Sequence, residues 1–234
     1  AATPRCFHVL VAPDGGSAFV AATPERLFRL DGRRLQTEAV AGTRPRAAHD
    51  ADDDRLLGEL MASEKDGREH AFVRDAIVER LGPLADRVRV DGAPTAMTLA
   101  LGRHLRTGIE ADLAPTTSAL DVLRALHPTP AVGGTPREAA REAIGHLEPF
   151  DRGLYAGAVG WIGRDAEGGE AAEFAVGIRS ALVRGRAVSL YSGAGIVAGS
   201  DPAAEWAEIE HKIGDFVRVL GTAPRPSRSA AVTA

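Results

Sequence analysis

Short apolar runs separated by turn residues fill the first part of the chain. The runs predict four strands, at residues 7–11, 18–22, 27–30 and 35–40. A Pro-Asp-Gly-Gly turn at residues 13–16 separates the first two strands. The dipeptide Asp31-Gly32 separates the last two, and an Asp-Gly pair between apolar runs favours a tight hairpin. The chain is therefore expected to begin with antiparallel strands.

The spacing of apolar residues changes to that of helices after a basic loop at residues 43–46. Asp54 is expected to begin a helical stretch made of two helices that meet near Ser63, with Pro83 just beyond the second. In that second helix one face is apolar, and its residues are Phe72, Val73, Ala76, Ile77 and Leu81. Alternation of apolar and polar residues over 102–113 then predicts another strand.

The last part of the chain mixes both patterns. Ser118 or Asp121 can cap a short helix that ends before His127, and Thr135 with Pro136 at the first helical position begins another helix, to residue 147. Three consecutive antiparallel strands are expected at residues 156–162, 172–183 and 187–197. A final helix at 202–220 begins at Ser200 or Asp201 followed by Pro202. These elements predict an α+β fold with antiparallel sheets and helices packed on their faces.

Composition restricts the class of protein. With 234 residues and 44% hydrophobic content, the chain can bury a sizeable core as one domain, residues 1–220, while the Pro- and Ser-rich residues 221–234 are expected to form a disordered tail. A net charge of −4 argues against binding to nucleic acid or an anionic membrane. The single cysteine, Cys6, cannot form an internal disulfide, no apolar run reaches transmembrane length, and no secretory signal pattern is visible. We therefore expect a cytoplasmic protein.

Two segments rich in Gly and Pro are candidate ligand contacts. Residues 126–134 read LHPTPAVGG, and residues 148–161 read EPFDRGLYAGAVGW. The first predicts a connector whose backbone amides stay free to face a ligand, since no regular element is expected there. The second joins a helix end to a strand of small residues, where a ligand can approach the backbone closely.

Two acidic pairs occur at helical spacing. On the final helix, Glu205, Glu208 and Lys212 share a strip beside the apolar stripe, which by spacing alone is an ordinary solvated flank. On the earlier helix, Asp66 and Glu69 extend the apolar face towards its N-terminal end. Buried carboxylates there would need a cation or capping donors, or would stabilise the helix start through its dipole. Cys6 and the scattered histidines give no zinc-binding spacing.

Further segments accompany these features in a fixed order along the chain. They are ATPERL at 22–27, EAVAGTRPR at 38–46, SEKDGREH at 63–70, FAVGIRSA at 174–181 and YSGAGIV at 191–197. From about Phe19 to Leu220, the chain closely resembles isochorismate synthases, within the wider family of chorismate-utilising enzymes. The resemblance implies the fold of that family, with its N-terminal part missing. It also implies a lysine general base on an upstream strand that nothing here matches, so we expect a fragment or a truncated chain with little activity.

The resemblance assigns roles to individual residues. It implies Mg²⁺ as cofactor, with Glu69 and Glu208 as the main ligands and Asp66 and Glu205 as further ones; oxygen ligands suit this ion. Glu25 matches the general acid that protonates the departing 4-hydroxyl, which requires a raised pKa. The substrate-binding residues implied are Gly42, Thr43, His104, Ala131, Val132, Tyr155, Arg179, Gly193 and Lys212. Of these, Arg179 is expected in a strand, where its guanidinium could grip a carboxylate of chorismate. His104 and His127 could equally be structural.

The function implied is the interconversion of chorismate and isochorismate, by addition of water at C2 and loss of the C4 hydroxyl. This reaction would feed menaquinone or siderophore biosynthesis, and we expect a monomer. The alternatives are a salicylate synthase, an anthranilate or aminodeoxychorismate synthase component, and a non-catalytic chorismate-binding module.

Overall fold

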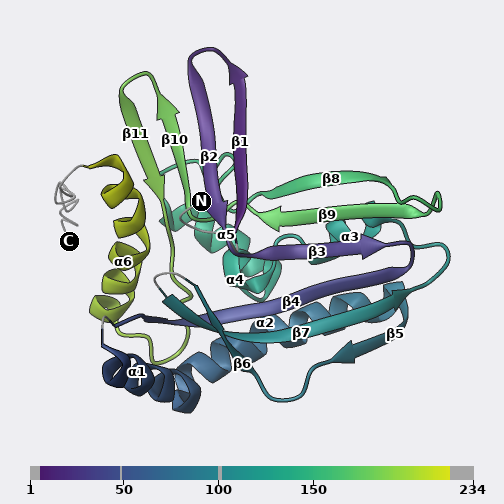
Figure 1. Ribbon diagram of the computed structural model, residues 1–234, viewed down its shortest axis with the longest axis horizontal. Helices are drawn as coiled ribbons and strands as arrows, with labels where there is room; N and C mark the ends of the chain where they lie inside the picture. Colours follow the sequence, from purple (N-terminus) through teal and green to yellow (C-terminus); the bar gives the residue numbers. More distant parts are fainter. Residues whose placement is uncertain (1–5, 48, 100–101, 222–234) are drawn as a thin grey trace.

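Two antiparallel sheets and the helices packed on them make up the computed structural model, which describes residues 6–47, 49–99 and 102–221. Within these residues the smaller sheet has four strands in the order β1-β2-β10-β11. They are β1 (Phe7–Asp14), β2 (Ser17–Thr23), β10 (Ser180–Arg184) and β11 (Ala187–Tyr191). Figure 1 shows these two hairpins projecting from the larger sheet.

The larger sheet has the order β5-β7-β4-β3-β9-β8, with β6 also paired to β7. Its strands are β3 (Arg26–Asp31), β4 (Arg34–Pro45), β5 (Ala85–Val90), β6 (Thr95–Thr98), β7 (Gly102–Leu113), β8 (Ala158–Arg164) and β9 (Glu170–Val176). The sequence predicted neither β5 nor β6. Both pair with β7, so the long central strand supplies the hydrogen bonds that these short segments need.

The helices alternate with groups of strands along the chain. They are α1 (Asp50–Ala62), α2 (Glu64–Leu81), the 3₁₀ turn η1 (Gly82–Leu84), α3 (Ala119–Leu126), α4 (Pro130–Gly133), α5 (Arg137–Leu147) and α6 (Pro202–Leu220). Helix α2 packs against β4 and β7, and its apolar face of Val73, Ile77 and Leu81 is buried in the core. None of the described helices is long and apolar enough to cross a membrane.

The predicted strand over residues 172–183 is wrong, and its correction locates the site. The segment divides into β9 in the larger sheet and β10 in the smaller one, because β9 pairs with β3 whereas β10 pairs with β2. Arg179 lies in the break between them, not in a strand, and has φ +49°. The chain also crosses from the smaller sheet to the larger one between β2 and β3, and Glu25 lies in that crossing. The amide of Val176 donates to the Glu25 carbonyl at 3.0 Å, so the two crossings are side by side.

Several helices and strands begin or end at other residues than the sequence predicted. Strand β4 continues through the predicted basic loop to Pro45, with a register shift at Gly42, whose φ is +76°. The connector at 126–134 contains the one-turn helix α4, so some of its amides are used within the helix. Helix α1 begins at Asp50 instead of Asp54, Pro136 precedes α5 instead of opening it, and β11 ends at Tyr191. Residues 222–234 of the predicted tail lie outside the described residues.

Candidate functional site

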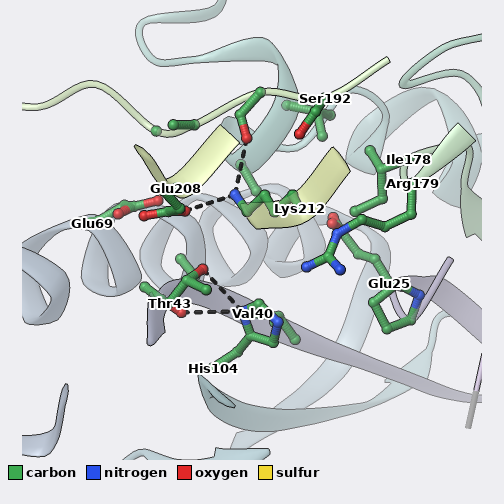
Figure 2. A pocket seen from close by; sticks show the side chains of 18 of the residues that line it. Glu25, Val40, Thr43, Glu69, His104, Ile178, Arg179, Ser192, Glu208 and Lys212 are labelled. Carbon is green, nitrogen blue, oxygen red and sulfur yellow. Dashed lines mark hydrogen bonds and ion pairs between the residues drawn. The ribbon is translucent and has the colours of Figure 1, made fainter. Parts of the chain in front are cut away.

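A cavity opens where the two sheets meet, beside the paired crossings (Figure 2). Every residue expected in the site lines it except Asp66 and Glu205. The lining residues are Pro24, Glu25, Val40, Ala41, Gly42, Thr43, Glu69, His104, Ala131, Val132, Glu148, Arg152, Tyr155, Ile178, Arg179, Ser192, Gly193, Ala194, Gly195, Glu208 and Lys212. Segments distant in the sequence therefore form one site.

Glu25 is the buried acid of this cavity. Only 9% of its surface is exposed. Burial, with the nearby carboxylate of Glu38, raises the pKa of Glu25 to about 7, while Lys212 and Arg179 act in the opposite direction. A carboxyl with such a pKa is about half protonated at pH 7, so it can donate a proton to a leaving group and take one back.

Two glutamates from different helices meet on the opposite wall. Glu69 comes from α2 and Glu208 from α6. Burial raises the pKa of Glu69 to about 7, where Lys65 opposes the shift and Glu208 adds to it. Lys212 pairs with Glu208 at 2.7 Å and donates to the Gly193 carbonyl at 2.9 Å. The ammonium group is thereby fixed at the cavity wall.

Asp66 and Glu205 lie behind this wall, each held by a basic partner. The carboxylate of Asp66, which is 1% exposed, pairs with Arg44 at 2.8 Å. The carboxylate of Glu205, 5% exposed, pairs with Lys65 at 2.6 Å. Glu69 forms no ion pair within the described part of the chain. The structure therefore divides the four carboxylates into two at the cavity, Glu69 and Glu208, and two behind its wall, a difference that sequence spacing could not show.

The donor set of the wall fits Mg²⁺ with few protein ligands. Among the described residues, no group of three or more His, Cys, Asp or Glu side chains is gathered closely enough to enclose a metal ion. The pair Glu69 and Glu208 remains, and Mg²⁺ commonly binds through one or two carboxylates while ligand oxygens and water complete its shell. A Cβ on Gly195 would come within 2.2 Å of the Glu69 Oε1 atom, so the glycine leaves room for that carboxylate.

Basic side chains face the cavity from two sides. Figure 2 shows Arg179 and Lys212 pointing into the same space from the sheet crossing and from α6. A ligand with two carboxylates could place one near each cation. Arg152, which sequence reasoning did not single out, bonds to Glu148 at 2.6 Å and to the Val132 carbonyl at 2.7 Å. Its guanidinium lies 5.6 Å from the centre of the Tyr155 ring, so it holds that ring and the α4 segment together.

His104 is a neutral hydrogen-bond acceptor in this site. Burial, with the positive charges of Arg179 and Lys212, lowers its pKa to about 3. Its Nδ1 lies 3.2 Å from the Gly42 carbonyl and 3.1 Å from the Thr43 hydroxyl. Because the carbonyl can only accept, we assign the proton to Nδ1. The lone pair of Nε2 is then free to accept, and this atom has no hydrogen-bond partner among the described residues.

His127 lies outside the cavity lining. It ends α3, and its carbonyl accepts from Arg137 at 2.8 Å, which supports the structural role for this histidine.

Comparison with known proteins shows the family of this chain. The sequence profile described as "Chorismate binding enzyme" matches residues 1–221. Isochorismate synthase 2 of Arabidopsis thaliana is 42% identical over 215 residues, which are 92% of this chain and 37% of the plant protein. Isochorismate synthase MenF of Escherichia coli is 42% identical over 220 residues, or 92% of this chain and 48% of that protein. The chain spans between 37% and 54% of the length of such relatives.

Solved structures show the same fold. The menaquinone-specific isochorismate synthase MenF of Escherichia coli superposes with a TM-score of 0.82 at 39% identity, covering 93% of this chain and 49% of MenF. Anthranilate synthase component I of Streptococcus pneumoniae superposes with a TM-score of 0.74 at 26% identity, covering 90% and 45%. The expected α+β fold is thus confirmed, and this chain belongs to the chorismate-binding enzyme family.

Proposed function

We propose that the cavity is the active site of an isochorismate synthase, which interconverts chorismate and isochorismate. In this reaction water adds at C2, the ring double bonds shift, and the C4 hydroxyl leaves as water, so the net change is an isomerisation. The observation that carries the proposal is the buried carboxyl of Glu25, with its pKa of about 7, in a cavity that also presents Arg179 and Lys212.

Each cavity residue has a task in this proposal. Glu25, protonated, gives its proton to the oxygen that leaves C4. Arg179 and Lys212 hold the two carboxylates of chorismate, and the Nε2 atom of His104 accepts from a ligand hydroxyl or from water. Glu69 and Glu208 would hold Mg²⁺, which when bound neutralises a substrate carboxylate.

We expect neither lysine of this chain to act as the general base. The chain has two lysines, Lys65 and Lys212, and both are paired with glutamates of α6. Neither is then available to take a proton from the attacking water. We therefore expect this chain alone to bind chorismate with Mg²⁺ but to convert it far more slowly than the longer relatives do.

Binding and products are tested separately. Calorimetric titration of the chain with chorismate, with and without Mg²⁺, should show metal-dependent binding that Lys212→Met weakens. The exposed residue Arg34 lies away from the cavity, so Arg34→Met is the matched control and should bind as the parent does. Absence of chorismate binding by the folded parent chain would refute the proposal.

The products formed by a longer protein, in which the N-terminal part of a relative precedes this chain, decide between related reactions. Isochorismate in equilibrium with chorismate, without an ammonia requirement, is the expected result. Salicylate with pyruvate would identify a salicylate synthase, and an ammonia-dependent amino product would identify an anthranilate-type enzyme. Either of those products would refute the isochorismate assignment.

A further inference from the structure

Both lysines of the chain contact glutamates of the same helix, α6. Of the 28 Lys and Arg residues of the chain, all are arginine except Lys65 and Lys212. Lys65 lies on α2, and Lys212 lies on α6. Each ammonium group contacts a glutamate of α6, Glu205 at 2.6 Å and Glu208 at 2.7 Å. All other basic Lys or Arg side chains are guanidinium groups, so the two ammonium groups of the chain are both found in contact with α6.

The Lys65–Glu205 pair joins two helices, whereas Lys212 and Glu208 belong to the same one. Helix α2 also carries Glu69, one helical turn after Lys65, and α6 carries Glu208. The pair therefore connects the two elements that must keep Glu69 and Glu208 facing each other. A change in the position of α6 would separate these carboxylates.

The described apolar side chains of helix α6 are at most partly buried, with Ile209, Ile213, Phe216 and Val217 intermediate in exposure. Figure 1 shows it at the margin of the molecule, beside β11 and above α1. Among its described side chains only Glu205 is buried, at 5% exposure, while Trp206 is 52% exposed. The most buried of the described side chains of this helix is thus a carboxylate paired with its counter-ion. Removal of one partner from such a pair leaves an uncompensated charge, which is strongly unfavourable.

The surroundings of Lys65 suit an ammonium group better than a guanidinium. Burial lowers the pKa of Lys65, but the carboxylates of Glu205, Glu69 and Asp66 together raise it above its usual value. An ammonium is compact and has three donors that can rotate, whereas the planar fork of arginine favours one bidentate partner. Asp66 already has its arginine partner in Arg44. A second guanidinium would need more room and would fit only one of the carboxylates.

We propose that Lys65 is a positioning residue, whose ion pair with Glu205 holds α6 against α2 and so keeps Glu208 opposite Glu69 for a divalent cation. Glu205 is then the counter-ion of Lys65 and not a ligand of the metal. This inference rests on the proposed function in one respect, namely that Mg²⁺ is the ion bound.

The direction in which each substitution changes Mg²⁺ affinity distinguishes this role from two alternative explanations. If Lys65 acted only through its charge on the metal, Lys65→Met would tighten Mg²⁺ binding, because a repelling cation is removed. If Glu205 were a ligand, Glu205→Gln would weaken Mg²⁺ binding while Lys65→Met would not. The positioning role predicts that both substitutions weaken it, by about 10- to 100-fold, as is usual for residues that orient metal ligands.

Mg²⁺ titration in the presence of chorismate, followed by calorimetry, measures this affinity for the parent and for Lys65→Met, Glu205→Gln, the double variant and Lys65→Arg. The double variant should be no weaker than the worse single one, because the two side chains act as one unit. Lys65→Arg should recover only part of the affinity. Arg55→Met removes an exposed pair within α1 and is the control that should bind as the parent does.

Amide hydrogen exchange without any ligand tests the contact independently of the function. Exchange in α6 should rise several-fold in Lys65→Met and in the nearly isosteric Glu205→Gln, but not in Arg55→Met. Unchanged α6 exchange in both folded variants would overturn the proposal, as would faster exchange with unaltered Mg²⁺ affinity. If the parent binds no Mg²⁺ while α6 exchange rises as expected, the ion pair holds the helix and the proposed function is what fails.

Discussion

Replacement of Glu25 by glutamine should stabilise the folded chain at neutral and alkaline pH and change its stability little in acid. The reason is the pKa of this carboxyl, which burial raises from 4.5 to about 7. Between these two values the native protein retains a proton that the unfolded chain releases. The free energy of unfolding therefore falls as pH rises through this window, and the stability that the neutral carboxyl contributes below pH 4.5 is lost by about pH 7.

The magnitude follows from the size of the shift. Each pKa unit corresponds to ~1.4 kcal/mol, so the cost of ionising buried Glu25 approaches ~3 kcal/mol at pH 8. Glutamine has nearly the same shape and does not ionise. The Glu25→Gln variant should thus exceed its parent in stability by about that amount at pH 8, and by little at pH 4.5.

Urea unfolding of this chain, followed by tryptophan fluorescence at several pH values from 4.5 to 8, measures the difference directly. Glu167→Gln, in the exposed turn between β8 and β9, provides the control and should track the parent at every pH. A difference between Glu25→Gln and its parent that stays constant across this range would refute the reasoning, since it would mean that Glu25 ionises as it does in the unfolded chain.

Two further substitutions test the site wall and the fold. Gly195→Ala should weaken Mg²⁺-dependent chorismate binding in calorimetry, because the added methyl group would come within 2.2 Å of the Glu69 carboxylate and displace it; unaltered binding would show that Glu69 need not lie there. Ser118→Ala removes the capping box with Asp121 at the start of α3 and should lower the free energy of unfolding by about 1 kcal/mol in urea titration, with ligand binding retained. A loss below about 0.3 kcal/mol would contradict a stabilising cap.

Local chemistry in the sequence was sufficient for many elements. The Asp31-Gly32 turn, the cap at Ser118 and the helix start at Ser63 all form as expected, because each depends on hydrogen bonds or backbone angles within a few residues. The strand at residues 102–113 was also predicted correctly, since its alternation persists over its whole length. Of the site residues that the resemblance implies, all but Asp66 and Glu205 line the cavity, although further lining residues such as Arg152 and Gly195 were not expected.

Tertiary structure decided what depends on partners remote in the chain. The apolar run at 172–183 is divided because β9 and β10 pair with different strands, and this pairing is invisible in the run itself. Likewise, spacing on two helices presents Asp66, Glu69, Glu205 and Glu208 as equals. Only the tertiary structure places Asp66 and Glu205 behind the wall with Arg44 and Lys65, and leaves Glu69 and the Glu208–Lys212 pair at the cavity. The reason is that a charge interacts strongly with the groups a few ångströms away, whatever their position in the sequence.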